Sequence, residues 1–251
     1  MIEIDRRDGN DVLRMARGKA NALDLVLTRA LFDALRKLRA ESTGALVVTG
    51  SDAIFSAGVD LKQILSGGAS YVEEFLPSMN AMFRELFIFP RPVVAAVNGH
   101  AIAGGCIMAL ACDWVVMARG EAEIGMPELP VGVPFPSIPL EIVRNAVSPE
   151  RFPALILRGK TCRPEEALEL GMVHEICDPA ALADRALEAA SRFTAMSPVA
   201  FAQVKGMIRQ PALDRFSESA ETEVLAIWKS PETAARIRGY LDEVLGARRK
   251  G

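Results

Sequence analysis

The sequence predicts an α/β fold in which short buried strands alternate with helices, followed by a purely helical C-terminal part. Two apolar runs of five residues, at 93–97 and 114–118, are typical of strands that are buried on both faces. Segments with apolar residues at helical spacing separate such runs. No further strand is predicted after about Pro179. This alternation is typical of layered α/β proteins.

The predicted elements follow one another in a regular order. The first helix covers residues 20–40, with Asn21 as its N-cap and leucines at three- and four-residue spacing. After it come strands at 44–51, 91–99 and 114–118, helices at 71–89 and 104–113, and shorter elements at 141–147, 164–172 and 172–178. Helices at 180–196, 197–208 and 231–246 complete the chain.

Composition excludes several classes of function. The net charge of −3 argues against nucleic-acid binding, which typically requires an excess of positive charge. Four cysteines without CxxC spacing and only two histidines predict no metal site, and they fit free thiols in a reducing compartment. Residues 1–10 lack the apolar region of a secretory signal, and polar residues interrupt the apolar segment 97–114, so no membrane span is expected. We expect a cytoplasmic protein.

Two predicted strands end in glycine-rich loops that run into helices. The first loop, in VVTGSDAIFSAGVDLKQI (47–64), contains Gly58, and the second, in VNGHAIAGGC (97–106), contains Gly104. Free N–H groups at a helix start favour negative charge. Either loop alone could simply let its helix pack closely on the sheet. Two such loops indicate a pair of N–H donors converging on one oxygen, as in an oxyanion hole.

The common nucleotide-binding and serine-hydrolase motifs are absent from the sequence. The sequence contains no GxGxxG, GxxxxGK[ST] or GxSxG pattern. No serine is placed beside His100, so we interpret this histidine as a polar loop or lining residue rather than a base. His174 is interpreted as structural.

One carboxylate lies in a third loop. Glu128 follows GMP and precedes a proline-rich apolar run within AEIGMPELPVGVPFPSIPLEIV (122–143). In such apolar surroundings desolvation would raise its pKa, which suits a general acid or base near neutral pH. A surface glutamate at a turn is the alternative.

Taken together, these segments resemble the crotonase (enoyl-CoA hydratase/isomerase) superfamily. The matching pieces, in order, are KANAL (19–23), FSAGVDL (55–61), PVVAAVNGHAIAGGCIMALACD (92–113), IGMPELPVGV (124–133), GMVHEI (171–176) and SPVAFAQVK (197–205). The resemblance implies a crotonase-like spiral of ββα turns in residues 1–190 and a helical C-terminal trimerisation region in 191–251. It also implies a homotrimer or hexamer that takes an acyl-CoA thioester as substrate and needs no other cofactor.

The resemblance also implies roles for particular residues. The oxyanion N–H groups would come from Val59 and Gly104, and the backbone near Ala57 would contact the adenine of coenzyme A. Lys62 would pair with its phosphates, unless it is a surface lysine without a role. Tyr240 and Trp228 match aromatic positions that close over coenzyme A in relatives, although core or interface packing would explain them equally well.

Ile107 is where the sequence departs from the hydratases of the family. They carry a glutamate there and a second one at the position of Glu128, and the two add water across a double bond. An isoleucine can neither hold water nor move a proton. We therefore expect a Δ3,Δ2-enoyl-CoA isomerase that uses Glu128 alone. The alternatives are a hydratase or another crotonase reaction, a non-catalytic acyl-CoA-binding protein, and a serine hydrolase on the related ClpP-type fold, which lacks a Ser/His pair here.

Overall fold

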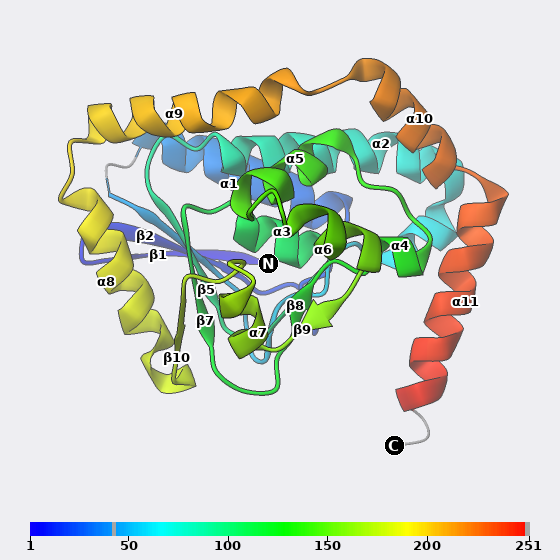
Figure 1. Cartoon of the computed structure of the whole chain (residues 1–251), viewed down its shortest axis with the longest axis horizontal. Coiled ribbons are helices and arrows are strands. Elements are labelled where there is room, and N and C mark those ends of the chain that lie inside the picture. Colours follow the sequence, from blue (N-terminus) through cyan, green and yellow to red (C-terminus); the bar gives the residue numbers. More distant parts are fainter. Residues whose placement is uncertain (42–43, 249–251) are drawn as a thin grey trace.

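A larger and a smaller β-sheet organise the chain in the computed structural model, which describes residues 1–41 and 44–248 (Figure 1). The strands of the larger sheet, in spatial order, are β1 (Ile2–Arg7), β2 (Asn10–Met15), β3 (Leu46–Thr49), β5 (Val93–Val97), β7 (Trp114–Ala118) and β10 (Glu175–Cys177). From β2 to β10 neighbouring strands are parallel, and only β1 runs antiparallel to its neighbour. The smaller sheet contains β4 (Ile54–Ser56), β6 (His100–Ile102), β8 (Ile124–Gly125) and β9 (Thr161–Cys162).

The two sheets are linked by a unit that recurs three times along the chain. In each unit one strand joins the larger sheet, the next joins the smaller sheet, and a helix follows. The units are β3–β4 with α2 (Leu61–Phe87), β5–β6 with α3 (Gly104–Leu110) and β7–β8 with α4 (Glu128–Val131). This arrangement confirms the predicted spiral of ββα turns.

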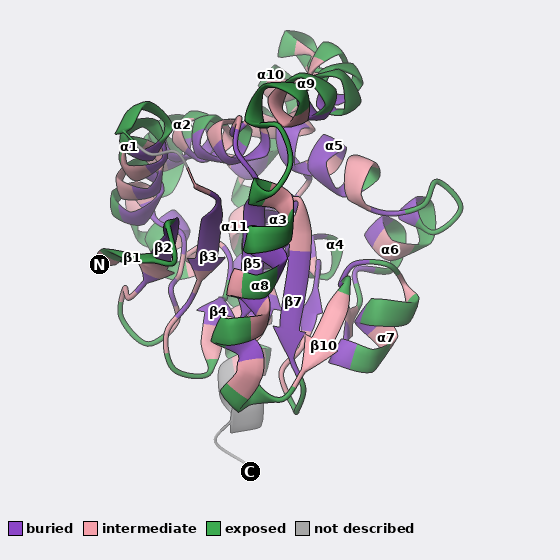
Figure 2. Ribbon diagram, turned by 90° about the vertical axis from the view of Figure 1, so that its left-hand side faces the viewer, coloured by how far each residue is buried: buried purple, intermediate pink, exposed green. Residues whose placement is uncertain are grey.

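Both faces of the larger sheet are covered, which explains why its strands read as continuous apolar runs. Val47, Val94 and Val116 pack against α8 (Leu182–Thr194) on one face. The alternate residues Val48 and Ala95 belong to the main core on the other face. In Figure 2 the central strands β3, β5 and β7 are buried almost throughout, while the outer faces of the surrounding helices are exposed.

The first helix begins later than the sequence predicted. Helix α1 spans Leu25–Glu41, and the side chain of Asp24 accepts a hydrogen bond from the N–H of Leu27 at 2.8 Å. Asp24 is therefore the N-cap, and the assignment of that role to Asn21 is wrong. Asn21 has a φ of 44° and accepts a hydrogen bond from the N–H of Arg17, so it closes the turn that precedes the helix.

Asp60 caps helix α2, where the sequence predicted that a helical segment begins. Its side chain accepts hydrogen bonds from the N–H groups of Lys62 and Gln63. The helix continues through most of the predicted segment 71–89 and ends at Phe87, although the backbone at Gly68 is not helical (φ 62°, ψ −155°). Gly68 therefore marks a kink rather than an end.

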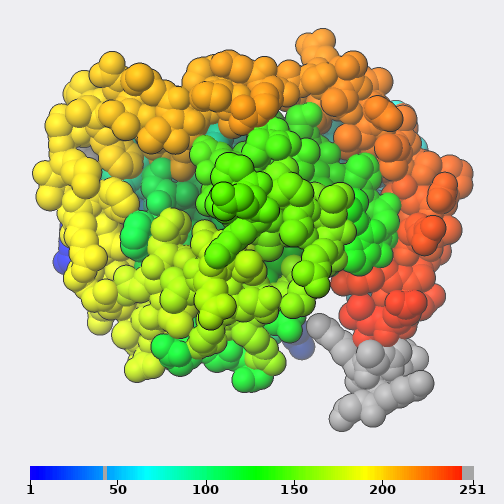
Figure 3. All heavy atoms as spheres, in the orientation of Figure 1, coloured from blue at the N-terminus to red at the C-terminus, as the bar shows by residue number. Residues whose placement is uncertain are grey.

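The C-terminal part is helical, as predicted. Before it, α5 (Ser137–Ala146), α6 (Phe152–Arg158) and α7 (Pro164–Glu169) lie between the strands, and a short 3₁₀ turn (Pro179–Ala181) leads into α8. The final helices are α9 (Pro198–Asp214), α10 (Glu218–Trp228) and α11 (Pro231–Arg248), which form a continuous band around the core in Figure 3. None of the described helices is both long and apolar enough to span a bilayer. The predicted division at residues 190 and 191, which falls within α8, stays a prediction.

Candidate active site

A small apolar cavity of about 80 Å³ lies where the ββα turns meet the C-terminal helices. Most of its lining comes from α2, the loop into α3, the segment from α4 to α5, the last residue of α10 and the middle of α11. The residues that the sequence predicted for the oxyanion hole, the acid–base group and the adenine contact line it together, namely Val59, Gly104, Glu128 and Ala57. These residues are far apart in the sequence, and the fold brings them to one place.

The two glycine-rich loops are in direct contact. Strands β4 and β6 pair in parallel, with Ser56 opposite Ala101, and this pairing aligns the loops that follow them. Gly58 has a φ of 80°, and a Cβ built on it would lie 3.1 Å from the amide nitrogen of Gly104. A side chain at Gly58 would therefore separate the loops, so glycine is required here for close approach as well as for its backbone conformation.

The backbone around Val59 and Gly104 leaves two N–H groups without strand or helix partners. The N–H of Leu23 donates to the carbonyl of Gly58, and the N–H of Asp60 donates to the carbonyl of Leu23. The N–H of Val59 therefore points away from Leu23. Gly104 is the first residue of α3, so its N–H has no acceptor within the helix. This is the backbone arrangement that an oxyanion hole needs.

Glu128 is buried, so it is not the surface glutamate that the sequence left as an alternative. Only 8% of the residue is exposed. Burial raises the pKa of its carboxyl to about 8, and a hydrogen bond from its own backbone N–H opposes part of that shift. Within the described part of the chain, the buried Oε2 atom of Glu128 has no hydrogen-bond partner. The carboxyl is therefore available to a bound molecule.

The rest of the cavity wall is almost entirely apolar. Ile107 is 3% exposed and lines the cavity together with Glu128. Among the described lining residues Glu128 carries the only carboxyl, and Tyr240 carries the only hydroxyl. The indole N–H of Trp228 donates to the carbonyl of Pro134 at 3.0 Å, which leaves its apolar rings in the wall. The cavity thus offers one group able to exchange a proton near neutral pH.

Three other polar residues from the sequence analysis lie outside this cavity. Lys62 is exposed next to Leu61, which does line it. The Nδ1 atom of His100 accepts the N–H of Glu123 at 3.1 Å, and that of His174 accepts the N–H of Val115 at 3.0 Å. Both histidines thus connect backbone segments, which agrees with the structural role predicted for His174.

Sequence reasoning missed much of the apolar wall. Met79 and Phe83 of α2, together with Phe135 before α5 and Pro139 within it, line the cavity but were not predicted as site residues. Met79 and Phe83 lie four residues apart on one face of the helix predicted at 71–89. The helical spacing of apolar residues could therefore have predicted that both are buried on the same side. Trp228 and Tyr240, for which packing was an equal explanation, both reach the cavity.

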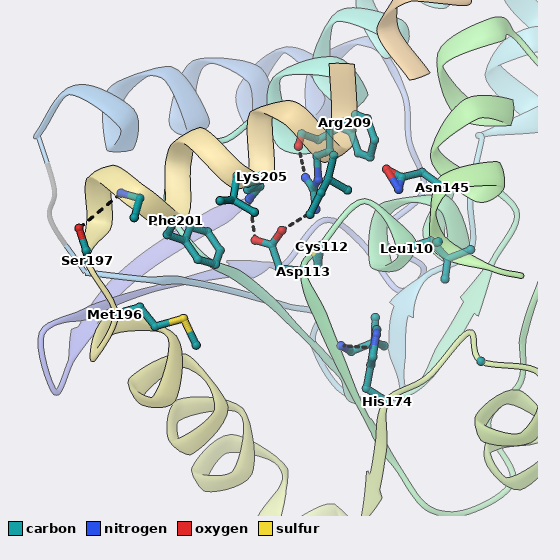
Figure 4. Close-up of a pocket in the computed structure, with 17 residues that line it drawn as sticks. Leu110, Cys112, Asp113, Asn145, His174, Met196, Ser197, Phe201, Lys205 and Arg209 are labelled. Atoms are coloured by element: carbon teal, nitrogen blue, oxygen red, sulfur yellow. Dashed lines mark hydrogen bonds and ion pairs between the residues drawn. The ribbon is translucent and has the colours of Figure 1, made fainter. Parts of the chain in front are cut away.

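A second and larger cavity of about 470 Å³ lies beneath α9 and contains none of the predicted site residues (Figure 4). Asp113 lies at its centre, where one carboxylate oxygen accepts Lys205 Nζ at 2.6 Å and the other accepts Arg209 at 2.6 Å. All three side chains are almost completely buried. Burial lowers the pKa of Lys205 to about 8 even though Asp113 opposes the shift. This network joins α9 to the core.

Comparisons with known proteins agree with this geometry. Residues 8–241 match the family described as enoyl-CoA hydratase/isomerase. A carnitinyl-CoA dehydratase of Salmonella paratyphi B is 33% identical over 199 residues, which cover 78% of this chain and 76% of that protein. A protein of Mycobacterium tuberculosis is described as an enoyl-CoA isomerase in one solved structure and as a probable enoyl-CoA hydratase in another. The first of these has a TM-score of 0.79 and 31% identity, with coverage of 90% of this chain and 96% of that one.

A third comparison concerns the fold alone. The human mitochondrial Δ3-Δ2-enoyl-CoA isomerase has a TM-score of 0.92 with 22% identity, covering 100% of this chain and 99% of that one. Its similarity extends through the C-terminal helices, because the whole chain is covered. From the matching segments, the ββα spiral and the family match over most of its length, the chain belongs to the enoyl-CoA hydratase/isomerase family.

Proposed function

We propose that this protein is an enzyme that converts a 3-enoyl-CoA into a 2-enoyl-CoA by a 1,3-proton shift, with Glu128 as its single acid–base group. One observation carries the proposal. A buried carboxyl with a pKa near 8 and an unpartnered oxygen is the only carboxyl among the described residues that line the cavity. Such a group can both take and return a proton near neutral pH.

The first part of the proposal concerns the thioester carbonyl, whose oxygen would accept hydrogen bonds from the N–H groups of Val59 and Gly104. Negative charge develops on this oxygen when a proton leaves the neighbouring carbon. Donors fixed in the backbone stabilise that charge without reorganising, and one such donor is typically worth about 10²–10³ in rate. The close contact of the Gly58 and Gly104 backbones supports this pairing of donors.

The second part concerns the proton. Ionised Glu128 removes a proton from C2 of the 3-enoyl thioester, and the electron pair spreads over C2, C3 and C4 and onto the carbonyl oxygen as a dienolate. The protonated carboxyl then returns the same proton to C4. The C3–C4 double bond moves to C2–C3, and Glu128 is again ionised. Nothing is added to the substrate and nothing is lost from it.

Ile107 favours isomerisation over hydration. A hydratase must place a water molecule and deliver a proton to the neighbouring carbon, which in the family takes two carboxyls. Ile107 offers no hydrogen bond, and the surrounding side chains are apolar. A dry site favours proton transfer between a carboxyl and carbon over addition of water. Relatives in the family carry both dehydratase and isomerase names, so this distinction depends on the residues of the cavity.

Coenzyme A binding and oligomeric state extend the proposal. Ala57 lies at the cavity with an exposed surface, and Lys62 is exposed nearby, so the two would contact the adenine and the phosphates. The proposal also includes a homotrimer or hexamer. Such an assembly would cover the apolar residues that α9 exposes, which are Val199, Val204, Met207 and Ile208. Light scattering coupled to size-exclusion chromatography tests the oligomeric state.

The proposed reaction is tested by incubating the purified protein with a 3-enoyl-CoA and, separately, with a 2-enoyl-CoA. Ultraviolet absorbance detects the conjugated product, and mass spectrometry detects added water. We expect conjugation without a change in mass, lost in Glu128→Gln and retained in Glu121→Gln, whose side chain is 91% exposed. Addition of water to the 2-enoyl-CoA at a comparable rate would overturn the proposal. Binding of coenzyme A esters without turnover would indicate a binding protein.

A further inference from the structure

We infer that the cavity accepts only short acyl groups, of about four to six carbons, and that Trp228 sets this limit. The inference rests on the proposed function, because it assumes that the acyl chain of the substrate enters the cavity beside Glu128. Three features of the structure support it: the size of the cavity, the contacts that hold the helix carrying Trp228, and the burial of other side chains in the cavity wall.

The size of the cavity gives the limit. A dry apolar cavity of about 150 Å³ takes up benzene, with six carbons. The cavity beside Glu128 measures about 80 Å³, roughly half of that volume. By the same ratio it holds about three carbon atoms, and because Val59 and Gly104 also line it, the thioester carbonyl shares this volume. A four-carbon acyl group therefore fills it. A small movement of Leu61, which is only partly buried, would admit one or two carbons more.

Hydrogen bonds hold both the side chain of Trp228 and the helix α10 that carries it. Its indole N–H is hydrogen-bonded to the carbonyl of Pro134, and the residue is 4% exposed. At the other end of α10, Glu221 accepts hydrogen bonds from the side-chain amide of Asn80, at 2.7 Å, and from the N–H of Ser137. These contacts tie α10 to both α2 and the start of α5. Rotating the indole would break its bond to Pro134, and moving the helix would break the bonds of Glu221.

Other side chains of the cavity wall are held as firmly as Trp228. Phe83 and Ile107 belong to the main core and are almost completely buried. Protein interiors are close-packed, so pushing such side chains outward forces strained rotamers in their neighbours. A longer acyl chain would have to displace either these side chains or Trp228. Trp228 is the larger of the obstacles and lies in a helix added after the ββα turns.

Binding of saturated acyl-CoA esters tests the limit without any need for turnover. In an open groove each added methylene would tighten binding about fourfold. Butanoyl-, hexanoyl-, octanoyl- and dodecanoyl-CoA are compared by isothermal titration calorimetry on the full-length protein. We expect affinity to rise as far as hexanoyl-CoA and to be at least about tenfold weaker for dodecanoyl-CoA. Affinity that keeps rising through dodecanoyl-CoA would overturn the inference.

Two pairs of variants assign the limit to Trp228. Trp228→Ala is expected to remove the discrimination against dodecanoyl-CoA, whereas Trp228→Phe keeps most of it. If Trp228→Ala does not fold, as judged by circular dichroism, Met79→Ala enlarges the same cavity from α2, and Met79→Leu is its matched control. An unchanged chain-length profile in a folded Trp228→Ala protein would contradict the role of Trp228.

The experiments distinguish a wrong chain-length limit from a wrong reaction. Should the protein bind short acyl-CoA esters tightly but convert no 3-enoyl-CoA, the reaction is wrong and the limit stands. Should it isomerise but-3-enoyl-CoA and dodec-3-enoyl-CoA with equal kcat/KM, the reaction stands and the limit is wrong.

Discussion

Ile107 and Glu128 face one cavity from two different helices, Ile107 from α3 and Glu128 from the first residue of α4. The first side chain is apolar and the second is a buried carboxyl with a raised pKa. Two groups that could each exchange a proton would let the site add water. One such group is what the proposed proton shift within the substrate requires.

Ile107→Glu should introduce hydration. The new carboxyl would share the cavity with Glu128 and could hold a water molecule while Glu128 supplies the proton. We expect addition of water to a 2-enoyl-CoA to become at least about 10² times faster than in the unmodified protein, the usual range for one acid–base group. Mass spectrometry of the product measures this. The control is Ile107→Gln, which has a similar size and cannot ionise.

Isomerisation should depend on pH through Glu128. The base must be ionised, and burial raises its pKa to about 8, so most of the free protein is in the inactive protonated form at neutral pH. We expect kcat/KM to rise about tenfold per pH unit up to pH 8 and to level off above it. Steady-state rates between about pH 6 and pH 9 measure the profile. A profile that is flat over this range would mean that Glu128 is ionised throughout.

The same carboxyl should make stability fall as pH rises. The pKa of Glu128 in the folded protein lies above its ordinary value of 4.5, so the unfolded chain releases this proton first. Its contribution to stability is full below about pH 4.5 and is lost as pH approaches 8. The free energy of unfolding should therefore fall by about 1.4 kcal/mol per pH unit in this window relative to Glu128→Gln. Urea denaturation at several pH values measures the difference, which should stay constant if Glu128 is not buried.

Asp113→Asn should destabilise the protein strongly. It leaves Lys205 and Arg209 buried without a counter-charge, and breaking such a buried pair typically costs about 3–5 kcal/mol. The control is Glu165→Gln, which removes an exposed partner of Arg119 and should cost less than about 1 kcal/mol. Chemical denaturation compares the two variants. Equal effects would show that the Asp113 network does not hold α9 in place.

Much of the fold could be predicted because its strands are buried on both faces and its helices have clear apolar periods. The N-terminal hairpin of β1 and β2 was not predicted, although Asp8-Gly9, with φ values of 50° and 77°, is the kind of pair that closes a two-residue turn. Strands β8 and β9 have only two residues each, too few for any periodic pattern. Their places depend on contacts between distant segments.

The candidate site was predictable where backbone chemistry or charge left a local signal. Gly58, Gly104 and Glu128 stand out in their own segments. Phe135 and Pro139 do not, because the proline-rich run that contains them has no regular period, and their place in the cavity wall follows from how α5 packs. Asn21 was mistaken for a helix cap because Asn suits both a cap and a tight turn, and only the three-dimensional structure distinguishes the two.

The central claim is that one carboxyl both removes the C2 proton and returns it at C4, and an isotope measurement tests it most directly. A 3-enoyl-CoA carrying two deuterons at C2 is converted in ordinary water, and the mass of the 2-enoyl product is recorded. The account predicts that a measurable share of the product keeps both deuterons, one of them at C4, because Glu128 is shielded from solvent. Loss of one deuteron from every product molecule would contradict it, because the proton added at C4 would then come from solvent or from a second donor.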